Sequence, residues 1–209
     1  MPLSEHTTFK LGGQARYFFR VKTVDELKQA LEFSTKENLP FFILGGGSNL
    51  LVNDAGFRGV VIKNELRGVA FADTGDSMEI IAMAGENWDD FVSECVKRGF
   101  YGLENLSGIP GTVGAAPVQN IGAYGTEVKN KIISVEVLDS VSGGLKLFST
   151  ADCRFSYRDS FFKTKEGKRC VITAVKFLLK KNGKPYLDYT DLKNYFAAAL
   201  KTNSAPPLA

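Results

Sequence analysis

The chain has 209 residues and a net charge of +3, with 44% apolar and 23% charged residues, as in a globular protein of one large or two small domains. Lysine and arginine are interspersed with acidic residues, so the charge gives no reason to expect a nucleic-acid partner. No apolar run approaches the ~18 residues of a membrane span and the N-terminus lacks a signal pattern, so we expect a cytoplasmic protein without a membrane partner.

Cysteine and histidine are too few for most metal or nucleophile chemistry. Cys95, Cys153 and Cys170 show no Cys-x-x-Cys spacing, so we expect neither a disulfide framework nor a metal site. Cys95 falls on the apolar face of a predicted helix and Cys170 opens an apolar strand, which predicts buried, inert thiols. His6 is the sole histidine and has no catalytic partner nearby in the sequence, which disfavours hydrolase mechanisms.

The N-terminal region predicts a βαβ crossover. Residues 15–21 are rich in aromatic residues and favour a strand. Thr23 and Glu26 have capping-box spacing and begin a helix that we expect to continue to Asn38. A second apolar strand starts at Phe41, so the segment after it lies at the carboxyl end of a parallel strand, where ligands bind in such sheets.

A glycine-rich turn, residues 45–49, follows that strand, and residues 50–52 are expected to form a further strand. Successive glycines allow positive φ and let several backbone N–H groups converge, so the turn can hold an anion such as a phosphate. It is neither a P-loop nor a dinucleotide fingerprint, because the lysine and the third spaced glycine are missing. A plain glycine-rich hairpin explains this stretch equally well.

Further strands are predicted at residues 60–63 and 79–84, separated by a polar loop within residues 64–76. Asn87 caps a helix that closes at Lys97, Arg98 and Gly99. Its apolar face predicts ordinary core packing and comprises Trp88, Phe91, Val92, Cys95 and Val96.

The C-terminal part predicts a hairpin of strands 132–139 and 145–148 joined across residues 142–144, a strand at 170–179, and a capped helix from about Thr190 to Leu200. We therefore expect an α+β protein with a small βαβ lobe (1–68) and a larger lobe (69–209) with a mixed sheet and helices, the latter ending in a linker helix.

The long stretch at residues 101–125 contains six glycines and two prolines, which exclude a regular helix or strand, yet apolar residues persist. Its backbone polar groups need partners, so a ligand wrapped by the loop is the favoured interpretation. The small residues Gly111, Gly114, Ala115 and Ala116 would let backbone lie flat against a planar ring system. The alternative is a glycine-rich connection in a packed interior.

Arg158 lies between Tyr157 and Asp159, with Phe155, Phe161 and Phe162 close by in the sequence. A guanidinium held at the edge of an apolar site can grip a carboxylate or stabilise developing enolate charge. Surface ion pairs between Arg158 and Asp159, or Arg154 and Asp152, are the alternative.

Taken together, the chain closely resembles the UDP-N-acetylenolpyruvoylglucosamine reductase family of peptidoglycan precursor synthesis. The resemblance rests on residues 6–13, 44–50, 85–88, 102–125 and 157–160, in this order.

The resemblance implies a two-lobed FAD-binding domain of the vanillyl-alcohol-oxidase/PCMH type. In that scheme NADPH reduces non-covalently bound FAD, which then reduces the enolpyruvyl group of a nucleotide-sugar substrate. Arg158 matches the family's catalytic arginine, and Tyr157, Arg158 and Tyr189 match positions at the substrate. The implied FAD residues are Leu44, Gly45, Gly46, Gly47, Ser48, Asn49, Ile109, Pro110, Gly111, Gly114, Ala115, Asn120, Gly122, Tyr124 and Ile172.

Two features depart from the family pattern. The family carries its proton-donating serine and a catalytic glutamate in a third domain, which we do not find within these 209 residues, so FAD binding is expected to be retained more securely than turnover. Ala115 and Ala116 replace hydroxyl residues of some relatives. Two alternatives remain: a flavin-binding module without turnover, and another flavin oxidase of the same fold, many of which attach flavin through a histidine.

Overall fold

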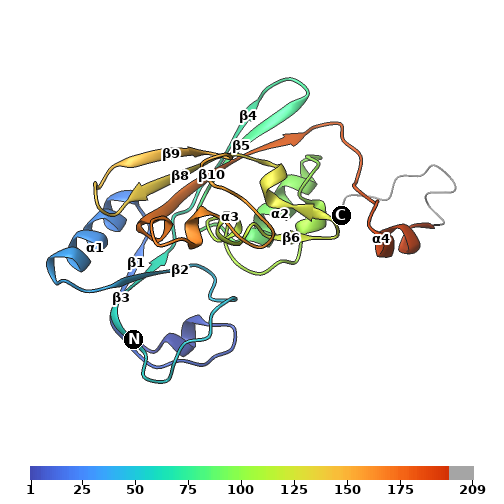
Figure 1. Ribbon diagram of the computed structural model, residues 1–209. Coiled ribbons are helices and arrows are strands. Elements are labelled where there is room, and N and C mark those ends of the chain that lie inside the picture. Colours follow the sequence, from blue (N-terminus) through green and yellow to red (C-terminus); the bar gives the residue numbers. More distant parts are fainter. Residues whose placement is uncertain (198–209) are drawn as a thin grey trace.

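The computed structural model describes residues 1–197, which form two lobes, each built around its own sheet (Figure 1). The small lobe has the strand order β1–β3–β2 and the large lobe β4–β5–β10–β8–β9. The strands are β1 (Ala15–Val21), β2 (Phe41–Leu44), β3 (Phe57–Asn64), β4 (Val69–Asp73), β5 (Ser77–Met83), β6 (Gly122–Ala123), β7 (Thr126–Glu127), β8 (Ile132–Asp139), β9 (Leu145–Ser149) and β10 (Cys170–Lys180). The α-helices are α1 (Val24–Lys36), α2 (Trp88–Lys97), α3 (Ala116–Gln119) and α4 (Thr190–Tyr195).

The predicted βαβ unit is confirmed. Both β1 and β2 run parallel to β3, which lies between them, and α1 is the crossover. The capping box is also confirmed, because Thr23 Oγ1 accepts from the Glu26 N–H at 3.1 Å and the Glu26 carboxylate accepts from the Thr23 N–H at 3.3 Å. The helix ends at Lys36 rather than Asn38, since Asn38 takes a left-handed φ of 50°.

The small sheet presents two different faces. Val60 and Ile62 belong to the core shared with α1, whereas Val61 packs with Leu3 on the opposite side, which we call the outer face. The N-terminal segment covers this outer face. Side chains alternate along a strand, so Lys63 shares the outer face with Val61.

The large sheet is antiparallel, with β10 at its centre between β5 and β8. Helix α2 packs on it through Trp88, whose ring centroid lies 6.2 Å from that of Phe177. The predicted cap is confirmed, since Asn87 Oδ1 accepts from the Asp90 N–H at 3.1 Å. The hairpin of β8 and β9 is confirmed as well.

The three cysteines, Cys95, Cys153 and Cys170, are buried free thiols, as predicted for Cys95 and Cys170. Burial raises the pKa of the Cys95 and Cys153 thiols to about 12, so neither is a thiolate near neutral pH.

The strand predicted at residues 50–52 is wrong. The chain there forms no ladder, and β3 begins only at Phe57. Instead this segment packs beside the N-terminus, where the Gly13 N–H donates to the Asn53 carbonyl at 3.0 Å. Leu51 consequently remains 78% exposed.

The polar loop predicted within residues 64–76 is also wrong, because β4 lies inside it and pairs with β5. Val69 and Phe71 pack against the large core, with exposed residues between and after them. A tight turn joins the two strands: Gly75 has a φ of 85° and its N–H donates to Asp73 Oδ1 at 2.8 Å.

The C-terminal helix begins at Thr190 as predicted but ends at Tyr195. Its N-cap residue is Tyr189, whose side chain makes no capping hydrogen bond, and the predicted extension over residues 198–200 lies outside the described residues. Within residues 1–197, no helix is both long and apolar enough to cross a membrane.

Candidate functional site

The glycine-rich turn leaves a row of backbone donors free. Among the described residues, none of the N–H groups of residues 46–49 donates a hydrogen bond to the protein. The carbonyls are held elsewhere: Gly45 O accepts from Lys63 Nζ, and Gly47 O accepts from the Thr8 N–H at 3.1 Å. With Gly47 at a φ of 73°, this arrangement suits an anion. The hairpin alternative is wrong, because no strand follows the turn.

The long glycine-rich loop runs along the junction between β5 and α2. The Gly114 N–H donates to the Ala84 carbonyl and the Val113 N–H donates to the Glu86 carbonyl, both at 2.9 Å. A Cβ at Gly114 would lie 2.6 Å from that of Ala84, so this approach requires glycine. The loop is not wholly irregular, which corrects the prediction: residues 116–119 form the single helical turn α3.

The turn and the long loop meet, although they are distant in the sequence. A Cβ at Gly46 would lie 3.0 Å from Gly111 Cα, and one at Gly45 would lie 2.9 Å from Thr112 Oγ1. Asn49 Nδ2 donates to Gln119 Oε1 at 2.7 Å. Two glycine-rich backbone segments therefore lie against each other. Because glycine has no side chain, such segments can also approach a ligand closely.

Asn120 anchors the far end of α3. It is fully buried, with a left-handed φ of 43° that ends the helical turn. Its Nδ2 donates to the Ser156 carbonyl at 2.8 Å, and its Oδ1 accepts from the Lys129 N–H at 3.2 Å. Its side chain thus fastens the long loop to the segment that carries Arg158.

Arg158 reaches back to the long loop. Its Nη2 donates to the Gly122 carbonyl, and its guanidinium lies 6.0 Å from the centroid of the Tyr157 ring. The alternative ion pairs, Arg158 with Asp159 and Arg154 with Asp152, do not form among the described residues. Of the phenylalanines close to Arg158 in the sequence, Phe161 packs against the large core, and the Arg154 guanidinium lies 4.9 Å from the centroid of its ring.

The segment bearing Tyr189 closes the other side of the loop. Tyr124 and Tyr189 meet edge to face with ring centroids 5.7 Å apart. A Cβ at Gly125 would lie 3.2 Å from the ring of Tyr186, and Asn105 Nδ2 donates to the Tyr186 carbonyl at 2.8 Å. The hairpin β6–β7 turns through Tyr124 and Gly125, both at positive φ.

The remaining candidate residues differ in how deeply they are buried. Ile172 is buried on β10, and its carbonyl accepts from Asn64 Nδ2 at 3.1 Å, which ties the two lobes together. Pro110 and Ala115 are exposed and Ile109 is half-buried. Lys63 was not predicted from the sequence. The available signal was a single lysine directly after the apolar residues 60–62 of β3.

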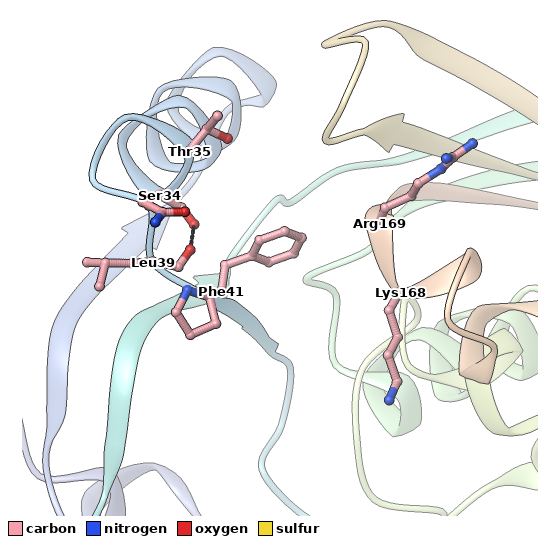
Figure 2. A pocket seen from close by; sticks show the side chains of 8 residues that line it. Ser34, Thr35, Leu39, Phe41, Lys168 and Arg169 are labelled. Carbon is pink, nitrogen blue, oxygen red and sulfur yellow. Dashed lines mark hydrogen bonds between the residues drawn. The ribbon is translucent and has the colours of Figure 1, made fainter.

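A separate cavity of about 420 Å³ lies away from these glycines. Figure 2 shows Ser34, Thr35, Leu39 and Phe41 on one wall and Lys168 and Arg169 on the other. The hydroxyls of Ser34 and Thr35 donate to the Leu39 and Leu31 carbonyls, so both are satisfied within the protein. We assign no ligand to this cavity.

Comparison with known families decides the class of this site. The model described as "FAD binding domain" matches residues 15–146, which include both glycine-rich segments. The chain belongs to this family. The match identifies FAD as the cofactor of this fold.

Two curated relatives of this chain have the same name. UDP-N-acetylenolpyruvoylglucosamine reductase of Neisseria gonorrhoeae is 46% identical over 191 residues, covering 91% of this chain and 55% of the relative. That of Pseudomonas syringae pv. syringae is 43% identical over 189 residues, covering 90% and 55%. The family resemblance inferred from the sequence is confirmed. The chain spans about half the length of the curated relatives it matches.

Solved structures confirm the predicted fold of the FAD binding domain. The reductase of the same name from Thermus caldophilus superposes with a TM-score of 0.73 and 29% identity, covering 97% of this chain and 68% of that chain. A solvent-stable cholesterol oxidase matches with a TM-score of 0.56 at 14% identity, covering 78% and 34%, and that likeness concerns the fold alone.

Proposed function

We propose that this chain is the FAD-binding portion of a cytoplasmic reductase that uses NADPH to convert UDP-N-acetylglucosamine enolpyruvate to UDP-N-acetylmuramate. The observation that carries the proposal is the meeting of three segments. The turn has four N–H groups without a partner among the described residues, the long loop lies against it, and Arg158 binds the loop. Nucleic acid and membrane have no part in this function.

In this proposal the diphosphate of FAD lies on the turn at residues 45–49. The site fits that group, because free N–H donors at positive-φ glycine favour anions, and Gly46 and Asn49 are exposed to receive one. The flavin and its ribityl chain lie along residues 109–125, where small side chains let a planar ring approach the backbone.

Bound FAD supplies the hydride transfer, and the protein supplies orientation and charge. Arg158 is suited to the enolpyruvyl carboxylate, because a guanidinium has five N–H donors and Arg158 uses one, on Gly122, among the hydrogen bonds of the described residues. That bond to Gly122 fixes the remaining donors relative to the loop that lines the flavin.

The tyrosines extend the site toward the nucleotide of the substrate. Tyr189 is 41% exposed and braced by Tyr124, so its hydroxyl can reach a diphosphate without the ring losing its support. Tyr157 is 81% exposed beside Arg158 and can contact the same substrate.

We assign proton delivery to none of the residues 1–197. The resemblance puts the donor in a third domain, and we propose that turnover requires that domain as a partner. General acid catalysis contributes about 10²- to 10⁴-fold to a rate, so the described lobes alone should turn over slowly.

A flavin oxidase with covalent histidine linkage is the less favoured alternative. His6 stacks on Phe18 with ring centroids 4.6 Å apart, on the outer face of the small sheet. Burial lowers its pKa, as do Arg20 and Lys63. This position lies behind the glycine-rich turn and not along residues 109–125.

Anaerobic half-reactions test the proposal. The protein should take up FAD, be bleached by NADPH, and regain its colour when the enolpyruvyl nucleotide sugar is added. Absence of FAD uptake would overturn every flavin-based function. Bleaching without substrate-driven reoxidation would instead support a flavin-binding module that needs its partner domain.

A further inference from the structure

Lys63 lies directly behind the glycine-rich turn and forms no ion pair with any carboxylate of residues 1–197. It lies on the outer face of the small sheet, and its ammonium donates to the Gly45 carbonyl. Leu44 and Lys63 are partners in the parallel ladder of β2 and β3, so the ladder itself sets the side chain beside the first peptide of the turn. This contact is therefore built into the fold and does not depend on a flexible loop.

The charge of Lys63 is not neutralised within the described residues. Arg20 pairs with Glu65 at 3.1 Å and Arg67 pairs with Glu86 at 2.9 Å, but Lys63 forms no ion pair. Burial lowers the pKa of its ammonium, and Arg20 and Arg67 lower it further against the opposing effect of Glu65. A half-buried, unpaired ammonium is costly unless an anion lies nearby.

The N-terminal segment holds the turn at a second point. The Thr8 N–H donates to the Gly47 carbonyl at 3.1 Å, and a Cβ at Gly47 would lie 1.9 Å from the His6 carbonyl. The carbonyls of Gly45 and Gly47 are thus both bound on the protein side. Among residues 1–197, the N–H groups of residues 46–49 have no hydrogen-bond acceptor in the protein.

We propose that Lys63 is a positioning residue of the FAD site. The Lys63 ammonium binds the Gly45 carbonyl, and this contact places its positive charge behind the N–H groups that receive the FAD diphosphate. This inference rests on the proposed function, because it takes the diphosphate to lie on the turn. Lys63 acts through the turn and need not touch the cofactor. A fixed positive charge in a partly dry environment is screened little by salt and attracts an anion over several ångströms.

The test compares FAD affinities of the parent protein, Lys63→Met and Lys63→Arg by titration of flavin fluorescence. Lys63→Met keeps the length but loses donor and charge, and should weaken FAD binding by about ten- to a hundredfold, as expected for a lost hydrogen bond to a charged group. Lys63→Arg keeps both and should restore most of the affinity. Lys176→Met is the matched control, since Lys176 is a strand lysine paired with Glu79 in the large lobe, and it should bind FAD like the parent.

The parent protein gives a second readout if Lys63→Met fails to fold. The protein is labelled with ¹⁵N-lysine, and the ammonium resonance of Lys63 is identified by its loss in Lys63→Arg. Addition of FAD should shift this resonance and leave that of Lys176 unchanged. A folded Lys63→Met protein that binds FAD within about twofold of the parent, or an unmoved Lys63 resonance, would overturn the inference. A parent that binds no FAD would overturn the proposed function instead.

Discussion

Asn49 and Gln119 are 70 positions apart in the chain, yet Asn49 Nδ2 donates to Gln119 Oε1 at 2.7 Å. The bond joins the glycine-rich turn of the small lobe to the helical turn α3 of the large lobe. It is a direct link between the two segments to which we assign the diphosphate and the flavin. Separating these segments should therefore weaken cofactor binding before it unfolds either lobe.

A double-mutant cycle measures this link. Asn49→Ala and Gln119→Ala should each lower FAD affinity several-fold, and the double variant should be little worse than either single one. The expected coupling is about 0.5–1.5 kcal/mol, as for a single hydrogen bond. Titration with FAD gives the four affinities. Fully additive effects would show that the link does not support the site.

Gly47→Ala tests the backbone of the turn. The residue has a φ of 73° and an added Cβ would lie 1.9 Å from the His6 carbonyl, so both strain and a clash are expected. FAD affinity should fall at least tenfold and the thermal midpoint should drop. Gly143→Ala is a matched control, because its φ is 67° but nothing lies within 4 Å of the added Cβ. It should cost only about 1–2 kcal/mol of unfolding free energy and leave FAD binding unchanged.

Arg158→Lys should separate the two half-reactions. Lysine keeps the charge but loses the planar donor set, so NADPH should still bleach the flavin while reoxidation by the enolpyruvyl substrate slows about tenfold or more. Stopped-flow absorbance in a turnover-competent form of the protein measures both rates. The control is Arg154→Lys, since the Arg154 guanidinium lies over the Phe161 ring at 4.9 Å, whereas that of Arg158 binds the Gly122 carbonyl. Equal reoxidation rates in Arg158→Lys and the parent would remove Arg158 from the mechanism.

Asp139 should dominate the acid sensitivity of the hairpin of β8 and β9. A hydrogen bond from Lys146 and the backbone N–H groups of Val141 and Ser142 lower the pKa of this carboxyl from 3.8 to about 2. A carboxyl whose pKa is lower in the folded protein stabilises the fold at pH values above its pKa in the unfolded chain. That contribution is lost as the pH falls from about 4 to 2.

Asp139→Asn should therefore lower the thermal midpoint at pH 7 and flatten its dependence on pH between 4 and 2. Asp76→Asn is the control, because Asp76 is exposed and accepts a hydrogen bond from the Lys181 N–H through its backbone carbonyl, which the substitution keeps. Thermal melts across this pH range provide the measurement. An unchanged acid profile in Asp139→Asn would assign the effect to other carboxyls.

The sequence predicted best those elements whose signals are local. The capping box of Thr23 and Glu26 and the cap at Asn87 each mark the start of a helix, and the turn at residues 142–144 marks a hairpin. The structure has all three. The glycines of the turn and the long loop likewise indicated a binding site, since glycine-rich composition predicts positive φ angles and close approach of the backbone.

The failures concern partners that lie elsewhere in the chain. Residues 50–52 have strand-like composition, but the N-terminal segment takes the place beside them, so no ladder forms. The turn α3 contains a proline and ends at Asn120, whose left-handed backbone is stabilised by Lys129 and Ser156. Lys63 was missed because its role depends on a contact with Gly45, which follows the neighbouring strand β2. The residue pattern of β3 alone does not predict that contact.

A crystal structure of the FAD complex tests the central claim most directly. We predict that the diphosphate oxygens accept hydrogen bonds from the backbone N–H groups of residues 46–49, with the isoalloxazine ring against residues 109–125 and the Arg158 guanidinium still bound to Gly122. A diphosphate bound elsewhere, with those four N–H groups facing only solvent, would contradict the account.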